Sequence, residues 1–305
     1  MENASDQRPR RRGLRSEKSE TIEKNDNEHR EVVWPEFIEH SATDYPTTQH
    51  MFAAIRKEIL HAISPAEITY SSIPRDWGAL IADFIDNNRE TEVSRSQISY
   101  NSLLKTLVIR TMPVLVHECH TSWVIRVQRR WEPLNLVTSD HLDNIDVYTN
   151  NLQERFAGQY LHSRKIPDLC IKSDDEYHPS FVIEVGWSES HKRLLEDMRL
   201  WLEGGAPHVK TVMVIKFTLK KKTNIVRGTA ELWSRNPAGR PVRTQKVDIF
   251  PATTSGASLH VSAGDLFGAA LPQGLPANTA LPFDIDLLRV QARKQLLHMS
   301  MVEAT

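Results

Sequence analysis

Cysteine is scarce in this chain, since only Cys119 and Cys170 occur among 305 residues. Two cysteines exclude a disulfide framework, and they do not have the paired spacing of a zinc site. No apolar run approaches the ~20 residues that a membrane helix needs, so we predict no transmembrane segment. The polar, Arg-rich start lacks the apolar stretch of a secretory signal. We therefore expect an intracellular protein, in the nucleus or the cytoplasm, with no membrane partner.

An excess of basic charge is also missing. The chain has 38 Lys and Arg against 39 Asp and Glu, for a formal net charge of -1. A strongly basic balance would have indicated nucleic-acid binding, so local basic runs have to make any such contact. Zinc-protease spacing is missing as well, because His117 and His120 are three residues apart rather than four. What remains is a globular composition with 40% hydrophobic and 25% charged residues.

The character of the sequence changes along the chain and predicts four parts. Residues 1–33 are charged and nearly free of large apolar side chains, so we predict a disordered polar tail with a basic run at 8–12. Residues 34–99 hold two amphipathic patterns, at 45–63 and 75–87, and predict a helical arm. Residues 100–250 combine strand-like and helix-like segments and form the predicted core domain. Residues 251–305 form an extension that ends in a closing helix from about residue 285 to 301.

Two acidic residues lie on neighbouring predicted strands. The segment 166–172 contains Asp168, and the segment 180–187 contains Glu184. Strand residues alternate between faces, so pairing of the two strands through the acidic turn at 174–176 would place both carboxylates on one face. Nearby carboxylates repel unless they share a proton or a cation, and Mg²⁺ accepts such oxygen ligands. The alternative is that Asp168 caps a turn and Glu184 faces solvent.

The elements after these strands predict a parallel crossover. An apolar stripe predicts a helix at 190–203, ended by Gly204 and Gly205. The run 209–217 predicts a strand that is buried on both sides. A strand, a crossover helix and a second strand form a right-handed parallel unit. With the helix predicted from Pro113 to about Arg130, the order is helix, paired strands, helix, strand.

This order and its acids resemble the PD-(D/E)XK nuclease superfamily. The residues that carry the resemblance are Pro167, Asp168, Glu184, the helix at 190–203 and the strand through Lys216. The segments 179–190, 265–268 and 284–286 are similar to a group of uncharacterised fungal proteins of that superfamily. The resemblance covers about residues 100 to 290. It implies an α/β fold with a restriction-endonuclease-like core (helix, mixed central sheet, crossover helix, strand), preceded here by the predicted helical arm.

The resemblance also implies roles for particular residues. Asp168 and Glu184 would bind Mg²⁺ or Mn²⁺, and an acid on the preceding helix, Glu118, would assist. A lysine two residues beyond the second acid normally positions the attacking water, but Gly186 stands there. Lys216 or Lys192 could replace it, with Lys216 slightly preferred because a strand holds a side chain more rigidly.

Two functional hypotheses follow from these residues. The first is a metal-dependent phosphodiesterase that acts on nucleic acid. The second is a catalytically inactive protein of the same fold that serves as a binding or interaction module, which Gly186 and the near-neutral charge favour. A third class, a structural protein without a ligand, would leave Asp168 and Glu184 far apart.

Overall fold

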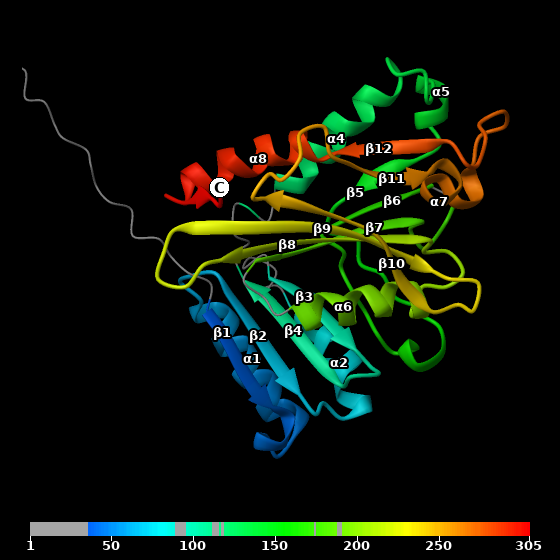
Figure 1. Cartoon of the computed structure of the whole chain (residues 1–305). Coiled ribbons are helices and arrows are strands. Elements are labelled where there is room, and N and C mark those ends of the chain that lie inside the picture. Colours follow the sequence, from blue (N-terminus) through cyan, green and yellow to red (C-terminus); the bar gives the residue numbers. More distant parts are fainter. Residues whose placement is uncertain (1–35, 89–95, 112–115, 117–118, 174, 188–190) are drawn as a thin grey trace, which may run out of the picture. The chain divides into compact units, whose positions relative to one another are not determined.

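The computed structural model describes residues 36–88, 96–111, 116, 119–173, 175–187 and 191–305 (Figure 1). All of these residues belong to one compact unit of the chain. The tail predicted at 1–33 and the candidate ligand Glu118 lie outside the described residues.

A four-stranded sheet with two helices forms the first part of the described chain. The strand order is β1-β2-β4-β3, with β1 parallel to β2 and the other pairs antiparallel. The strands are β1 (Glu36–Ser41), β2 (Ala66–Ser71), β3 (Gln97–Asn101) and β4 (Thr106–Thr111), and the helices are α1 (Thr48–His61) and α2 (Arg75–Asp86). Helix α1 begins after the capping residue Thr47 and buries Met51, Ile55 and Ile59, which the four-residue spacing places on one helical face.

The predicted helical arm at 34–99 is therefore wrong as a description of this region. Its two helices are present, but three strands accompany them, and two of these, β2 and β3, pair with β4 from the predicted core. The physical reason is visible in β2, where the charged Glu67 and the polar Thr69 are buried beside Ile68 and Tyr70. Apolar and polar residues do alternate along Ala66–Ser71, which is a strand pattern that the sequence analysis missed, but the burial of the polar face depends on partners from distant segments.

The second sheet is the centre of the molecule. Its strand order is β10-β9-β8-β7-β6-β5, and β13 pairs with β9. Strands β7 and β8 are parallel, as predicted for a crossover, and the other pairs along that order are antiparallel. The strands are β5 (Asp146–Tyr148), β6 (Leu169–Lys172), β7 (Phe181–Trp187), β8 (Thr211–Leu219), β9 (Ile225–Arg235), β10 (Pro241–Phe250) and β13 (Val302–Glu303).

Helices cover both faces of this sheet. Helix α4 (Cys119–Trp131) and helix α8 (Ile285–His298) lie on one face, and α6 (His191–Arg199) lies on the other (Figure 1). Helix α6 continues as a π-helical turn, η4 (Leu200–Gly204). Alternate residues of β6 and β7 pack on the two sides: Leu169 and Ile183 join the α4 and α8 core, whereas Cys170 and Val182 join the α6 core. The predicted pairing of these two strands is confirmed.

The C-terminal extension contains more structure than a closing helix. Strands β11 (Ser258–Ser262) and β12 (Ala280–Asp284) pair with each other, and the short helices α5 (Ser139–Leu142) and α7 (Ala263–Phe267) complete the α-helices described. The closing helix is confirmed as α8, capped by Asp284.

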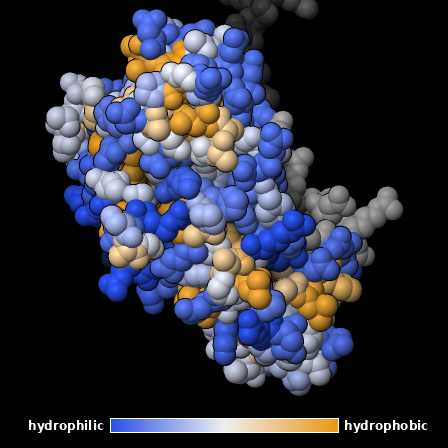
Figure 2. All heavy atoms as spheres, turned by 90° about the vertical axis from the view of Figure 1, so that its right-hand side faces the viewer, coloured by the Kyte–Doolittle hydropathy of each residue, from blue (hydrophilic) through white to orange (hydrophobic). Residues whose placement is uncertain are grey.

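None of the helices in the described ranges has the length and apolar character needed to cross a bilayer. On the face drawn in Figure 2, hydrophobic side chains form several small patches within a mostly hydrophilic surface.

Candidate active site

The two candidate acids lie directly beside each other in the central sheet. Leu169 pairs with Ile183, so Asp168, just before β6, lies opposite Glu184 on β7. Both side chains are 0% exposed. The backbone N–H of Val185 donates to Asp168 Oδ2 at 2.6 Å, which ties the first acid to the second strand. The structure thus brings together the two acids that the sequence analysis singled out.

Lys165 is the cation that the structure adds to this pair. Its Nζ lies 3.4 Å from Glu184 Oε2 and 2.6 Å from Asp197 Oδ2 on α6. Burial disfavours the charged amine, but the carboxylates of Asp197 and Glu184 outweigh it and raise the pKa of Lys165, so the side chain stays protonated. An antiparallel bridge between Gln153 and Lys165 holds the segment that carries it.

A hydrogen bond from η4, the continuation of α6, holds the other carboxyl oxygen of Glu184. Trp201 Nε1 donates to Glu184 Oε1 at 2.7 Å, inside the apolar cluster under the sheet. Burial raises the pKa of Glu184 to about 8, Lys165 lowers it and the neighbouring Asp168 raises it. A carboxyl that lies among apolar groups beside a second acid holds its proton more strongly than it would in water.

Two charged side chains of the first sheet, Arg110 and Glu67, also belong to the site. Arg110 on β4 lies 3.6 Å from Asp168 Oδ1, and its Nε is 3.1 Å from Glu67 on β2. Arg193 on α6 also pairs with Glu67. Burial opposes the ionisation of Glu67, but Arg110 and Arg193 outweigh it and lower the pKa of that carboxyl. A chain of alternating charges therefore joins the first sheet, α6 and the two acids.

Among the described residues, this chain of charges has one more acid than base. It consists of Arg193, Glu67, Arg110, Asp168, Glu184, Lys165 and Asp197. The neighbouring buried carboxyls Asp168 and Glu184 disfavour the ionisation of both, and a shared proton or cation relieves this repulsion. The raised pKa of Glu184 indicates which group takes the proton.

The donor chemistry of the acid pair fits a divalent cation of the Mg²⁺ type. Carboxylate oxygens are its preferred ligands, and one or two protein carboxylates often suffice because water or substrate fills the other positions. Among the residues that the structure describes, no group of three or more His, Cys, Asp or Glu side chains could hold a metal. Asp168 and Glu184 are the two carboxylates that would hold such a cation, and its remaining ligands would come from outside the described residues.

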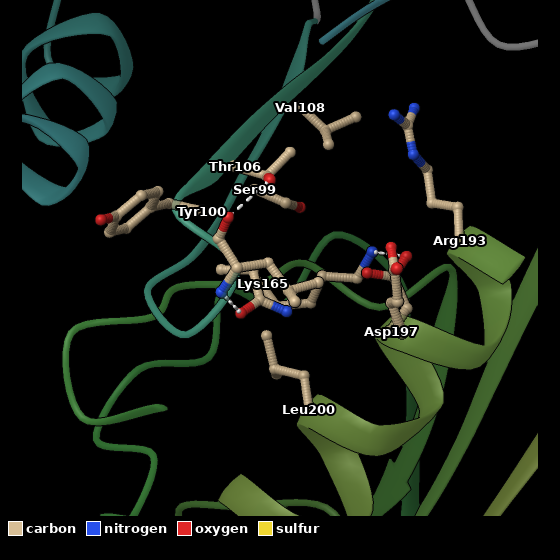
Figure 3. A pocket seen from close by; sticks show the side chains of 11 residues that line it. Ser99, Tyr100, Thr106, Val108, Lys165, Arg193, Asp197 and Leu200 are labelled. Atoms are coloured by element: carbon tan, nitrogen blue, oxygen red, sulfur yellow. Dashed lines mark hydrogen bonds and ion pairs between the residues drawn. The ribbon is translucent and has the colours of Figure 1, made fainter. Parts of the chain in front are cut away.

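A small pocket leads toward this network between the first sheet and α6 (Figure 3). Its volume of about 20 Å³ suits a water molecule, and its wall includes Thr106 and Val108 from β4 and Arg193 and Asp197 from α6. Figure 3 shows Lys165 reaching toward Asp197 at the edge of the pocket. The pocket is therefore lined by Lys165 and Asp197, the two residues of the network next to Glu184 on the α6 side.

The other predicted lysines lie elsewhere. Lys192 is 86% exposed and pairs with Glu196 at 3.7 Å along α6, so it is not brought to the acids. Lys216 pairs with Gly186 in the sheet register, which places it on the Glu184 face, two residues farther along the strand. The sequence analysis missed Lys165, Arg110, Asp197 and Trp201. The one available signal was the position of Lys165 three residues before Asp168.

Protein-family models give no match to this chain, and a search of curated protein sequences finds no significant match either.

Proposed function

We propose that the protein is a Mg²⁺- or Mn²⁺-dependent phosphodiesterase of the nuclease type, acting on nucleic acid, with a restriction-endonuclease-like core. The observation that carries the proposal is the position of Lys165 Nζ, which lies 3.4 Å from Glu184 Oε2 in the same buried group as Asp168. It supplies an ammonium group next to the acid pair, although Gly186 occupies the usual position of the lysine. The element order α4, β5–β7, α6, β8 supports the core assignment.

Each residue has a distinct role in this proposal. Asp168 and Glu184 would hold the cation, which, when bound, activates water and stabilises the charge that develops on a phosphate. The Val185 N–H and the Trp201 indole orient one oxygen of each acid. Lys165 places a positive charge beside Glu184, where it offsets negative charge on the phosphate. Loss of one such charge-stabilising donor typically costs about 2.7–4 kcal/mol in the barrier.

Cleavage of labelled DNA and RNA by the purified chain, with Mg²⁺ or Mn²⁺, tests the proposal. Asp168→Ala is expected to abolish cutting, and Lys165→Met is expected to reduce it by two to three orders of magnitude, roughly the effect of one lost donor. Lys294→Met, an exposed lysine on α8, is the matched control and should cut normally. Cutting that survives in Asp168→Ala would refute the assignment.

A second function is favoured by a different observation. The side chains of Asp168 and Glu184 are fully buried, and Arg110 and Lys165 already face them. In a catalytically inactive binding module, this network would serve to fasten the first sheet to the core. That function predicts no Mn²⁺ binding in calorimetry and no cleavage by a stably folded wild type. Mn²⁺ binding that is lost in Glu184→Ala would contradict it.

A further inference from the structure

The central sheet extends beyond the helix that covers the candidate site. Helix α6 packs against β7 and β8. On the same face, strands β9 and β10 carry Arg227, Arg243 and Lys246, whose side chains are exposed, and β8 carries the partly buried Lys216. We call these four residues the basic sheet face.

The strand register connects this face to the acid pair. Glu184 lies opposite Val214, and Val214 lies opposite Glu231. Glu231 in turn lies opposite Lys246 on β10. Residues directly opposite each other share a face of the sheet. Since neighbouring strands lie ≈ 4.8 Å apart, three steps place the backbone of Lys246 roughly 14 Å from that of Glu184. Lys216, opposite Gly186, lies between the two.

A buried carboxylate fixes two of the cations in place. Glu231 Oε1 lies 3.0 Å from Arg243 Nη1 and 3.3 Å from Lys246 Nζ, yet both cationic side chains remain 45% exposed. Trp233 Nε1 donates to the other oxygen of Glu231 at 3.1 Å, and His191 at the start of α6 lies 3.9 Å from it. The contacts with Glu231 restrain the side chains of Arg243 and Lys246 at the surface, so these side chains lose less rotamer entropy when they bind a ligand.

Charge on this side of the sheet favours an anionic partner. Asp248, which is partly buried, lies opposite Thr229 on the same face, so the four cations of the basic sheet face outnumber its two acids, Glu231 and Asp248. The exposed lysines at 220–222 form the turn between β8 and β9. A row of cations spread over three strands suits a ligand with repeated negative charges, such as a chain of phosphates.

We propose that the basic sheet face binds the phosphate backbone of a nucleic-acid strand and directs it toward Asp168 and Glu184. The identity of the ligand rests on the proposed function, but binding does not require cleavage. Backbone contacts of this kind position a strand without reading its bases. Affinity should therefore depend steeply on salt and little on sequence.

Fluorescence anisotropy of labelled oligonucleotides, with EDTA present and at about 50 to 200 mM salt, measures this binding. Arg243→Gln with Lys246→Gln should reduce the slope of log Kd against log salt by about 2, and Arg227→Gln alone by about 1. Arg227→Gln leaves both cations of Glu231 in place, so it remains informative if the double variant folds poorly. Arg126→Gln with Arg129→Gln, exposed on α4 across the sheet, removes the same charge and should leave the slope unchanged.

The outcomes separate this proposal from the nuclease assignment. Binding that responds to these variants, in a protein that does not cut with Mg²⁺, would support the basic sheet face and count against catalysis. Cutting with unaltered binding in the Arg227 and Arg243/Lys246 variants would overturn the binding surface and leave catalysis standing. The surface is also overturned if the wild type binds no oligonucleotide, if polyglutamate binds as tightly, or if the α4 control lowers the slope equally.

Discussion

The protonation of Glu184 gives the sharpest test of the candidate site. Its pKa is raised from the ordinary value of 4.5 to about 8, chiefly by burial. Because the folded-state pKa lies above the unfolded one, the resulting stability is fully present below about pH 4.5 and is lost as the pH rises through 8. Over that window the folded protein binds one more proton than the unfolded chain. We therefore replace Glu184 with glutamine, which cannot titrate.

The magnitude follows from linkage. One extra proton in the folded state lowers the free energy of unfolding by about 1.4 kcal/mol for each pH unit. From pH 5 to pH 8 the wild type should lose roughly 4 kcal/mol from this group, on the same basis. Glu184→Gln can still accept the hydrogen bond from Trp201 and escapes this loss. The stability of the variant relative to the wild type should rise with pH by that amount.

Urea unfolding at pH 5, 6, 7 and 8 in EDTA measures the difference. Glu39→Gln, on an exposed position of β1, is the control and should follow the wild type at every pH. If the difference between Glu184→Gln and the wild type stays constant from pH 5 to pH 8, the carboxyl does not keep its proton and the reasoning about the site fails. Under the proposed function, Mn²⁺ should flatten the wild-type pH dependence, because a bound cation favours the ionised acid.

Three substitutions test the packing around the site. Lys165→Met leaves buried carboxylates without their cation and should lower the free energy of unfolding by about 3–5 kcal/mol in urea titrations; an unchanged midpoint would show that the pair contributes nothing. Trp201→Phe leaves Glu184 Oε1 without its donor and should cost about 1–3 kcal/mol, measured the same way. Gly204→Ala would bring a methyl group within 2.9 Å of Tyr160 Cβ, and the crowding should lower the free energy of unfolding by about 1–3 kcal/mol, whereas an equally stable variant would show that the π-helical turn shifts freely.

Local patterns were sufficient to predict the centre of the fold. The alternation of apolar residues along β6 and β7 gave their core faces, and the apolar stripe of α6 gave the crossover helix. Both patterns repeat within a few residues, so they do not depend on distant parts of the chain. In the first sheet, the alternation along β2 was a strand signal that the sequence analysis missed. Local patterns do not show that Glu67 is buried there, because its partners Arg110 and Arg193 lie 43 and 126 residues away.

The sequence by itself determined which acids form the candidate site and on which side of the central sheet they lie. The lysine beside them was decided only by the tertiary structure. Lys165 reads as a polar residue in a connecting segment, and it becomes a buried ammonium because Asp197 and Glu184 converge on it from a helix and a strand. A lysine can be buried only where acids compensate its charge, and such compensation depends on contacts between distant segments. Gly186 stands where the resemblance would place a lysine, and Lys165 brings a positive charge beside the acid pair from another segment.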